Sequence, residues 1–191
     1  MKHYQDITLL PDAEVPVHFL LSKVFMQIHI AFVEEKNKSG MMQYAVSFPE
    51  YGETSLGNKI RIFSIDRNEL EKLDIRTKLS RFSDYVHVTS IRDVPERITS
   101  YEIFSRYQVD GSVHQKAKRY VSRHPGISYE EATRLLRQKN GKTKLPYVQM
   151  LSLSNSNRFR LFVKRTVVDA PLHMECGTYG LSDECTVPKL P

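Results

Sequence analysis

One histidine stands out as the residue best able to do acid–base chemistry. His29 follows Ile28 in a stretch whose apolar side chains recur every three or four residues, so it lies at the margin of the apolar face of a predicted helix. An imidazole titrates near neutral pH without any perturbation, and it can therefore serve as a general base. The competing interpretation is a packing role, with the ring nitrogens satisfied by hydrogen bonds.

Positive charge is concentrated in the second half of the chain. Residues 1–97 carry 13 Lys and Arg against 14 Asp and Glu, whereas residues 98–191 carry 15 against 8. A concentrated basic surface attracts polyanions, so nucleic acid is the expected partner. The alternative is a solvated basic segment that has no ligand.

The basic residues are densest in one predicted helix. Lys116, Arg119 and Arg123 fall at i, i+3 and i+7 and share a face of this helix, and Lys118 and His124 flank that face. Side chains arranged in this way suit the phosphates along one groove of a duplex. Proteins contact the deep, narrow major groove of A-form RNA mainly through its backbone and shape. A structured RNA such as a hairpin is therefore predicted at least as strongly as a single strand.

Three further residues are candidates for contacts to bases. Arg and Gln form bidentate hydrogen bonds with guanine and adenine, and Arg106 and Gln108 would point the same way on an extended linker. Phe159 lies between two arginines and could stack on a base or on the end of a duplex. Ordinary surface or core roles are the alternatives for all three.

The chain carries no carboxylate cluster and no His/Asp set of the kind that holds a catalytic metal. This pattern fits an RNA-cleaving route in which the ribose 2′-hydroxyl is the nucleophile, since that route needs only a base and a group that holds the hydroxyl in line. Ser152 and Ser154 lie on one face of a predicted strand, opposite Leu151 and Leu153. Any half-exposed strand has the same pattern.

Composition places the chain among ordinary globular proteins, with 40% hydrophobic and 26% charged residues. No apolar run approaches the roughly 18–20 residues of a membrane span, and the N-terminus lacks the apolar core of a signal peptide. A cytoplasmic location without membrane contact is expected. In a reducing cytosol Cys176 and Cys185 are predicted to be free thiols, and a zinc site that includes His173 would lack a fourth ligand.

The first half of the chain is predicted to be an α+β domain of ferredoxin-like βαββαβ type, with two helices on one face of a four-stranded antiparallel sheet. Asp66, with Glu69 three residues later, is a typical helix start. Pro95 and the polar residues after it predict a boundary near residue 97. The expected elements are a strand at His3–Leu10, a helix from about Pro16 to Glu35, strands at Tyr44–Phe48 and Ile60–Ile65, a helix from Asp66 to about Phe82, and a strand at Tyr85–Ile91.

Residues 98–191 are predicted to form a second, RNA-binding domain. Its first segment, residues 98–111, is expected to be irregular. The remaining elements are the basic helix over residues 113–124, a second helix from Ser128 to about Lys139, and a hairpin of Leu145–Ser154 and Phe159–Val167 around Asn155-Ser156-Asn157.

Short motifs along the whole chain resemble those of one family. They are His3-Tyr4-x-Asp6-Ile7, Leu10-Pro11-Asp12, His29, Val46-Ser47-Phe48-Pro49, Ser105-Arg106-Tyr107-Gln108, Arg123-His124, Leu145-Pro146, Ser152-x-Ser154, Phe159-Arg160-Leu161-Phe162 and Tyr179-Gly180-Leu181-Ser182. Each motif is weak by itself, but their order and spacing are specific. The chain is similar to the subtype I-F CRISPR-associated repeat-processing endoribonucleases, which cut precursor CRISPR RNA at the base of a repeat hairpin.

The resemblance implies three catalytic residues. His29 would be the general base, Ser152 would hold the 2′-hydroxyl of the nucleotide before the cut, and Tyr179 would orient the histidine. The family uses no metal or other cofactor, and it leaves a cyclic phosphate or its hydrolysis product.

The resemblance also implies how the RNA is held. Arg106 and Gln108 would read bases at the foot of the stem, Phe159 would stack under its terminal pair, and the basic helix would lie in the major groove. Because the family stays bound to its product, other subunits of the CRISPR surveillance complex are implied as partners.

The sequence departs from the family's pattern in two places. Lys118 and Ser122 stand in a helix that is arginine-rich in the family, and a lysine contacts phosphate as a point charge rather than a fork. The turn after Ser154 lacks the threonine–glycine often found there. Two other functions stay open: a non-catalytic hairpin-binding subunit of a CRISPR ribonucleoprotein, and a binder of duplex DNA.

Overall fold

The computed structural model describes residues 1–108, 113–139, 143–152, 156–172 and 175–190. Contacts group the chain into two compact units. The sheet unit comprises Met1–Tyr107 and Leu145–Pro191, and the helical unit comprises Gln108–Lys144. This grouping differs from the predicted boundary near residue 97, which stays a prediction about domains. Both β-sheets of the protein belong to the sheet unit.

The first antiparallel sheet contains the four strands that the sequence predicts for residues 1–97. Its strands are β1 (His3–Leu9), β2 (Tyr44–Ser47), β3 (Lys59–Ser64), β4 (Val86–Val88) and β5 (Arg92–Asp93). They lie in the order β2-β3-β1-β4, and the short β5 pairs with β1. The α+β class is thereby confirmed, whereas the ferredoxin-like arrangement stays a prediction.

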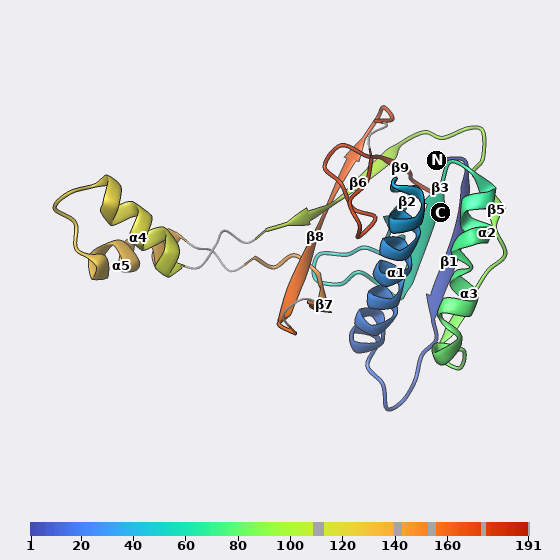
Figure 1. Ribbon diagram of the computed structural model, residues 1–191, viewed down its shortest axis with the longest axis horizontal. Helices are drawn as coiled ribbons and strands as arrows, with labels where there is room; N and C mark the ends of the chain where they lie inside the picture. Colours follow the sequence, from blue (N-terminus) through green and yellow to red (C-terminus); the bar gives the residue numbers. More distant parts are fainter. Residues whose placement is uncertain (109–112, 140–142, 153–155, 173–174, 191) are drawn as a thin grey trace. The chain divides into compact units, whose positions relative to one another are not determined.

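Helix α1 (Val17–Ser39) lies over one face of this sheet beside the next helical segment (Figure 1). It continues past the predicted end at Glu35 and stops at Gly40, whose φ of +77° is left-handed and whose N–H donates to the Lys36 carbonyl. Two lysines in the last turn suit the negative end of the helix dipole.

By length and hydropathy α1 passes the test for a membrane span, with a mean hydropathy of 1.3 over its most apolar 18 residues. The sequence-based expectation was that no segment would do so. Seven of its apolar side chains are nevertheless buried in the protein core, which is how a core helix behaves. They are Leu20, Leu21, Val24, Phe25, Ile28, Ala31 and Phe32.

The second helical segment is broken, although a continuous helix to Phe82 is predicted. It consists of α2 (Arg67–Leu73), α3 (Ile75–Lys78) and the 3-10 turn η1 (Ser80–Phe82). Asp74 has a left-handed φ of +41°, which ends α2, and its carboxylate accepts a hydrogen bond from the Thr77 N–H, which starts α3. Short Asp side chains tolerate this conformation and favour caps over helix interiors.

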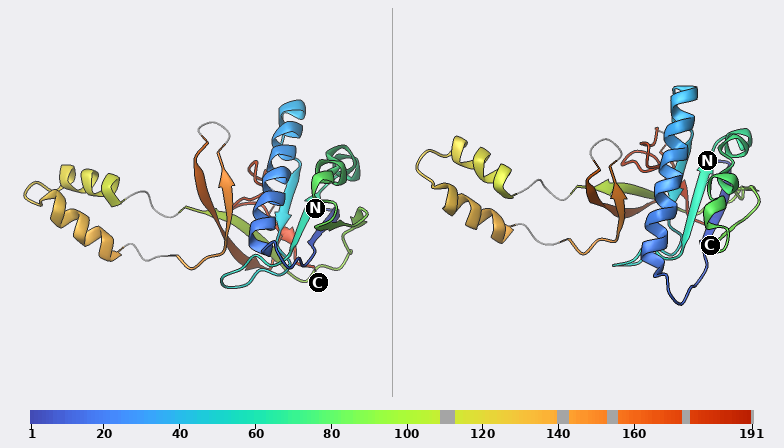
Figure 2. Two further views of the ribbon diagram at one scale, coloured as in Figure 1. Left: turned by 90° about the horizontal axis from the view of Figure 1, so that it is seen from below. Right: turned by 60° about the horizontal axis from the view of Figure 1, so that its bottom comes forward.

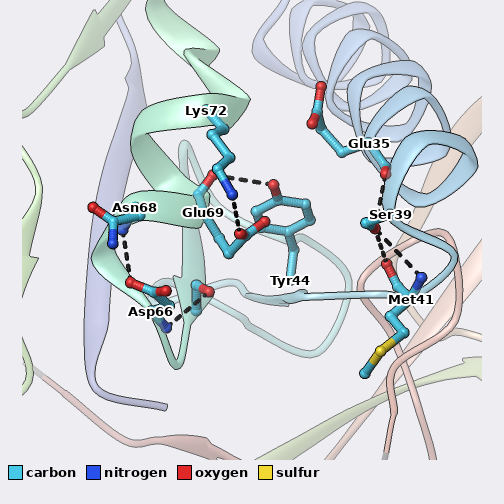
Figure 3. A network of polar contacts seen from close by, with 9 residues as sticks. Glu35, Ser39, Met41, Tyr44, Asp66, Asn68, Glu69 and Lys72 are labelled. Carbon is cyan, nitrogen blue, oxygen red and sulfur yellow. Dashed lines mark hydrogen bonds and ion pairs between the residues drawn. The ribbon is translucent and has the colours of Figure 1, made fainter.

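Polar contacts tie the C-terminal end of α1 to its surroundings and join β2 to α2 (Figure 3). The Ser39 hydroxyl bonds to the Glu35 carbonyl, and the Tyr44 hydroxyl donates to the Glu69 carbonyl at 3.0 Å. The Tyr44 ring stacks on Phe32 of α1, with centroids 4.9 Å apart. Burial and two neighbouring carboxylates raise the pKa of Tyr44, so its hydroxyl stays protonated and can donate.

The second antiparallel sheet corrects one prediction. Its strands are β6 (Tyr101–Tyr107), β7 (Tyr147–Leu151), β8 (Arg158–Val168) and β9 (Val187–Pro188), in the order β7-β8-β6-β9. The predicted hairpin is confirmed as β7 and β8, but the segment expected to be irregular contains β6, an inner strand. Buried Glu102 and Ser105 hide its strand pattern, and Glu102 is tolerated because Arg165 on β8 lies 3.6 Å away.

Helix α1 also packs against the second sheet, as Figure 2 shows for β7. The Ser22 hydroxyl donates to the His18 carbonyl and accepts the N–H of Gln149 on the edge strand β7. Phe48 contacts Phe25 of α1 and Phe104 of β6, with ring centroids 5.8 and 5.7 Å apart. One hydrophobic core therefore runs through both sheets and α1.

In the helical unit α4 (Val113–Arg123) packs against α5 (Tyr129–Lys139). The fully buried Ala117 and Ala132 are small enough to let the two helices approach closely. Ser128 caps α5 by accepting the Glu131 N–H. Both helices confirm the predicted spans.

We predict that Ser22→Ala lowers the free energy of unfolding by about 1–3 kcal/mol, because it leaves the N–H of Gln149 on the edge of β7 without its acceptor. Urea unfolding measures this loss. Ser83→Ala in an exposed turn is the control and should change stability by less than about 0.5 kcal/mol. Equal effects of the two substitutions would show that the α1–β7 hydrogen bond contributes nothing.

Candidate active site

His29 lies half-buried on α1, at the margin of its apolar face as the sequence predicts. Its Nδ1 is 2.9 Å from the carbonyl oxygen of Thr178. A carbonyl only accepts hydrogen bonds, so Nδ1 carries the proton and the lone pair lies on Nε2. The ring of Tyr179 stacks on the imidazole, with centroids 4.3 Å apart and planes 24° from parallel. These two contacts fix both the tautomer and the plane of the ring.

Burial lowers the pKa of His29 below its ordinary value, and the hydrogen bond to Thr178 offsets only part of this effect. The imidazole is therefore neutral at neutral pH. A neutral imidazole with an available Nε2 lone pair can accept a proton from a hydroxyl group.

Gly180 brings the Thr178–Tyr179 segment to His29. Its carbonyl accepts the N–H of Val46 on the edge strand β2 at 2.9 Å, and the N–H of Ser182 donates to Phe104 of β6 at 3.0 Å. A Cβ on residue 180 would lie 2.6 Å from Val46 Cγ2 and 3.0 Å from Phe32 Cε2, and the φ of +69° is itself unfavourable for other residues. Only glycine fits this position without rearrangement.

Arg106 lies between the stacked rings of His29 and Tyr179 and the β7–β8 hairpin. Its guanidinium carbon lies 5.9 Å from the centroid of the Tyr179 ring and 5.8 Å from that of Phe159. Both distances are within the range of cation–π contacts. Arg106 is near the end of β6, and Phe159 is the second residue of β8. The structure thus brings together His29, Tyr179, Arg106 and Phe159 from four separate segments.

Of the two serines predicted for the site, the structure describes only Ser152. Ser152 directly follows β7, where its N–H donates to the Asn157 carbonyl and its carbonyl accepts the Ser156 N–H, both at 2.9 Å. It is half-buried at the end of the same hairpin as Phe159. Ser154 lies outside the described residues.

The basic residues of the predicted RNA-binding helix lie on α4 or just after its end, in the helical unit. Lys118, Arg119, Arg123 and His124 are exposed, and Lys116 is half-buried. Gln108–Lys144 carries nine Lys and Arg against three Asp and Glu, a net charge of +6 that equals that of the whole chain. The sheet unit is therefore electrically neutral in sum.

Gln108 and Arg106 fall in different units. Gln108 is exposed directly after β6 and is the first residue of the helical unit, whereas Arg106 belongs to the sheet unit. The predicted pairing of their side chains thus stays a prediction.

In the part of the chain that the structure describes, no three His, Cys, Asp or Glu residues are grouped closely enough to hold a metal ion. His173 lies outside that part. Cys176 and Cys185 are buried free thiols, as predicted. A hydrogen bond between them, together with burial, raises the pKa of the Cys176 thiol.

Comparison with known families matches residues 4–190 to the CRISPR-associated proteins described as Cas_Csy4. The chain belongs to the Cas_Csy4 family. Relatives named "CRISPR-associated endonuclease Cas6/Csy4" include one from Escherichia coli (strain UTI89 / UPEC), 29% identical over 189 residues, and one from Pseudomonas aeruginosa (strain UCBPP-PA14), 32% identical over 192 residues. Each alignment covers 98% of this chain and 99% of the relative. The family predicted from the motifs is confirmed.

A solved structure titled "CRISPR associated protein Cas6" also aligns with 98% of each chain, at 9% identity and a TM-score of 0.33. This likeness is too weak to support an argument about the site.

Two parts of the site in this Cas_Csy4 protein could not be fully predicted from the sequence. The Thr178 carbonyl has no sequence signal, because any residue supplies a backbone carbonyl. Gly180 does leave one, since a glycine directly after an aromatic residue in a loop indicates a left-handed turn or a close backbone contact. That signal does not say which element the loop contacts.

We predict that Gly180→Ala lowers the free energy of unfolding by about 2–5 kcal/mol, through left-handed strain and the clash with Val46. Gly40→Ala is the matched control, since Gly40 has φ +77° but no atom within 4 Å of the place that a Cβ would take, and it should cost only about 1–2 kcal/mol. Urea unfolding compares the two.

The same Gly180→Ala variant should shift the His29 imidazole signals in NMR spectra, while Gly40→Ala leaves them unchanged. Unchanged His29 signals in a folded Gly180→Ala protein would contradict the assigned position of the loop.

Proposed function

We propose that this protein is an endoribonuclease that cleaves precursor CRISPR RNA at the base of the repeat stem-loop, without a metal ion, by attack of the 2′-hydroxyl. Family membership and relatives named as CRISPR-associated endonucleases support the class of activity. The observation that carries the mechanism is His29, a neutral imidazole of fixed tautomer. Such a group is what in-line attack by a ribose hydroxyl requires of a base.

In this mechanism each side chain has a separate task. Nε2 of His29 removes the proton of the 2′-hydroxyl, which attacks the adjacent phosphorus as the bond to the 5′-oxygen of the next nucleotide breaks. The expelled 5′-oxygen takes up a proton from water, and the imidazolium returns its proton to the solvent. The products are a 2′,3′-cyclic phosphate, or the 3′-phosphate formed by its hydrolysis, and a 5′-hydroxyl. Tyr179 keeps the imidazole oriented by stacking on it. Ser152, at the end of β7, holds the 2′-hydroxyl in line.

The RNA is held by contacts on both units in this proposal. The positively charged helical unit contacts the phosphates of the stem through Lys116, Lys118, Arg119, Arg123 and His124. Arg106 and Gln108 contact bases at the foot of the stem, and Phe159 stacks under its terminal pair. Tight binding keeps the protein on the product hairpin, and with it the protein joins the other subunits of the CRISPR surveillance complex in the cytoplasm.

The first test uses the repeat RNA in EDTA under single-turnover conditions. We expect complete cleavage, and we expect no cleavage of RNA with a 2′-deoxy substitution at the nucleotide before the cut. Cleavage of the deoxy substrate, or inhibition by EDTA, would rule out this mechanism. RNA that binds but never shortens would favour the non-catalytic hairpin-binding subunit.

His29→Ala should slow cleavage by about 10²–10⁴-fold while hairpin affinity changes little, because a general base contributes on this scale. His87→Ala, at an exposed histidine on β4, is the matched control and should cleave like the wild type. Parallel loss of binding and cleavage in His29→Ala would indicate a structural role for the histidine.

The rate of the chemical step should rise with pH up to the pKa of His29 and then level off. The protonated imidazole cannot accept the hydroxyl proton, so activity is lost as the pH falls through that pKa. Because burial lowers the pKa, the midpoint should lie below about 6.5, the ordinary value. Single-turnover rates from about pH 4.5 to 8 measure it, and a midpoint above the ordinary value would contradict the assignment of His29 as the base.

A further inference from the structure

A groove of about 890 Å³ runs along the N-terminal half of α1. One wall is α1 itself, and the other is formed by β7 and the first residue of β8. The loop of residues 54–57 and Phe82 of η1 complete it. All of these segments belong to the sheet unit.

On each of the three main segments that line the groove, α1, β7 and β8, the lining ends close to a residue of the candidate active site. On α1 the lining reaches Met26 and Gln27, which lie within one turn of His29. On β7 it reaches Leu151, the residue before Ser152, and on β8 it includes Arg158, the residue before Phe159. None of these lining residues is part of the proposed catalytic machinery. The lining of the groove therefore ends within one helical turn of His29 and one residue of Ser152 and Phe159 along the chain.

Aromatic rings and cations occur together in this groove. Phe19 is 52% exposed, and the Lys23 ammonium lies 5.3 Å from its ring centroid. Tyr147 is 41% exposed, and the guanidinium of Arg160, a residue outside the groove lining, lies 4.7 Å from the centroid of its ring. Arg158 adds another cation, and the described lining residues include no Asp or Glu. Proteins bind single-stranded nucleic acids in this way, with bases stacked on exposed rings and phosphates beside cations.

The groove is also held in a fixed shape. The Ser22 hydroxyl lies in its lining and bonds both to the His18 carbonyl and to the Gln149 N–H, which ties α1 to β7 along the groove. The spacing between α1 and β7 is therefore already set before a ligand binds, which reduces the entropic cost of association.

We propose that this groove binds a single-stranded segment of the RNA, the unpaired nucleotides that continue from the foot of the hairpin past the cut site. The inference rests on the proposed function, since it is the hairpin that delivers the flanking strand to the groove. Bases stack on Phe19 and Tyr147, and phosphates lie beside Lys23 and Arg158. Precursor RNA is thus held on both sides of the reacting phosphate, which restricts its backbone near His29.

The test compares three RNAs, all with a 2′-deoxy substitution at the cut so that none is cleaved. One is the stem-loop alone, and the others add eight unpaired nucleotides on its 5′ or its 3′ side. The wild type should bind the RNA extended past the cut site more tightly than the stem-loop, and the extension on the other side should add no comparable affinity. Phe19→Ala should reduce that gain about tenfold, and Lys23→Glu should make the affinity for the extended RNA less dependent on salt.

Two variants outside the groove serve as controls. Met41→Ala truncates an apolar side chain that is 54% exposed, and Lys2→Glu reverses an exposed charge. Both should keep the full gain from the extension, and all four variants should bind the stem-loop alone like the wild type.

The outcomes separate this inference from the function on which it rests. If the wild type fails to bind the stem-loop, the proposed function itself is wrong. If the stem-loop binds but the extension past the cut site adds no affinity, or the groove variants keep the gain, the groove does not bind the RNA that follows the cut.

Crosslinking provides a measurement that needs no variant. 4-Thiouridine in the favoured extension should crosslink to peptides that contain Phe19 or Tyr147. Crosslinks confined to other peptides would overturn the proposal.

Discussion

The candidate site depends on the close contact that Gly180 makes with β2 and α1. Here a backbone carbonyl bonds to the edge of one sheet, and two residues later a backbone N–H bonds to the other sheet. Because a Cβ would collide with Val46 and Phe32, this contact requires a residue without a side chain. It holds the Thr178 carbonyl on His29 and the Tyr179 ring against the imidazole, and so it determines the tautomer, the orientation and the burial of the proposed base.

The net positive charge of the protein and the proposed reacting groups lie in different units. The helical unit has the same net charge as the whole chain, while the sheet unit, with as many acidic as basic residues, contains His29, Tyr179, Arg106, Phe159 and Ser152. The lowered pKa of His29 follows from burial rather than from nearby cations. Positive charge identifies the class of partner, but it does not identify the reacting groups.

Much of the fold could be predicted because its signals are local. The spacing of apolar residues in α1 and the cap at Asp66 each depend on residues close together in the sequence. The two errors have different origins. β6 was missed because Glu102 is buried against Arg165, more than sixty residues away. The break at Asp74 was missed because an aspartate can end one helix and begin the next.

For the site, the sequence by itself determined which chemical groups are available: an imidazole at the edge of an apolar face, a basic helix, and motifs specific enough to indicate the family. Only the tertiary structure decided which of them meet. His29 and Thr178 are 149 residues apart, and their contact arises from packing of the C-terminal loop on α1 and β2. The shift in the pKa of His29 follows from that packing, since burial depends on neighbours in space rather than in sequence.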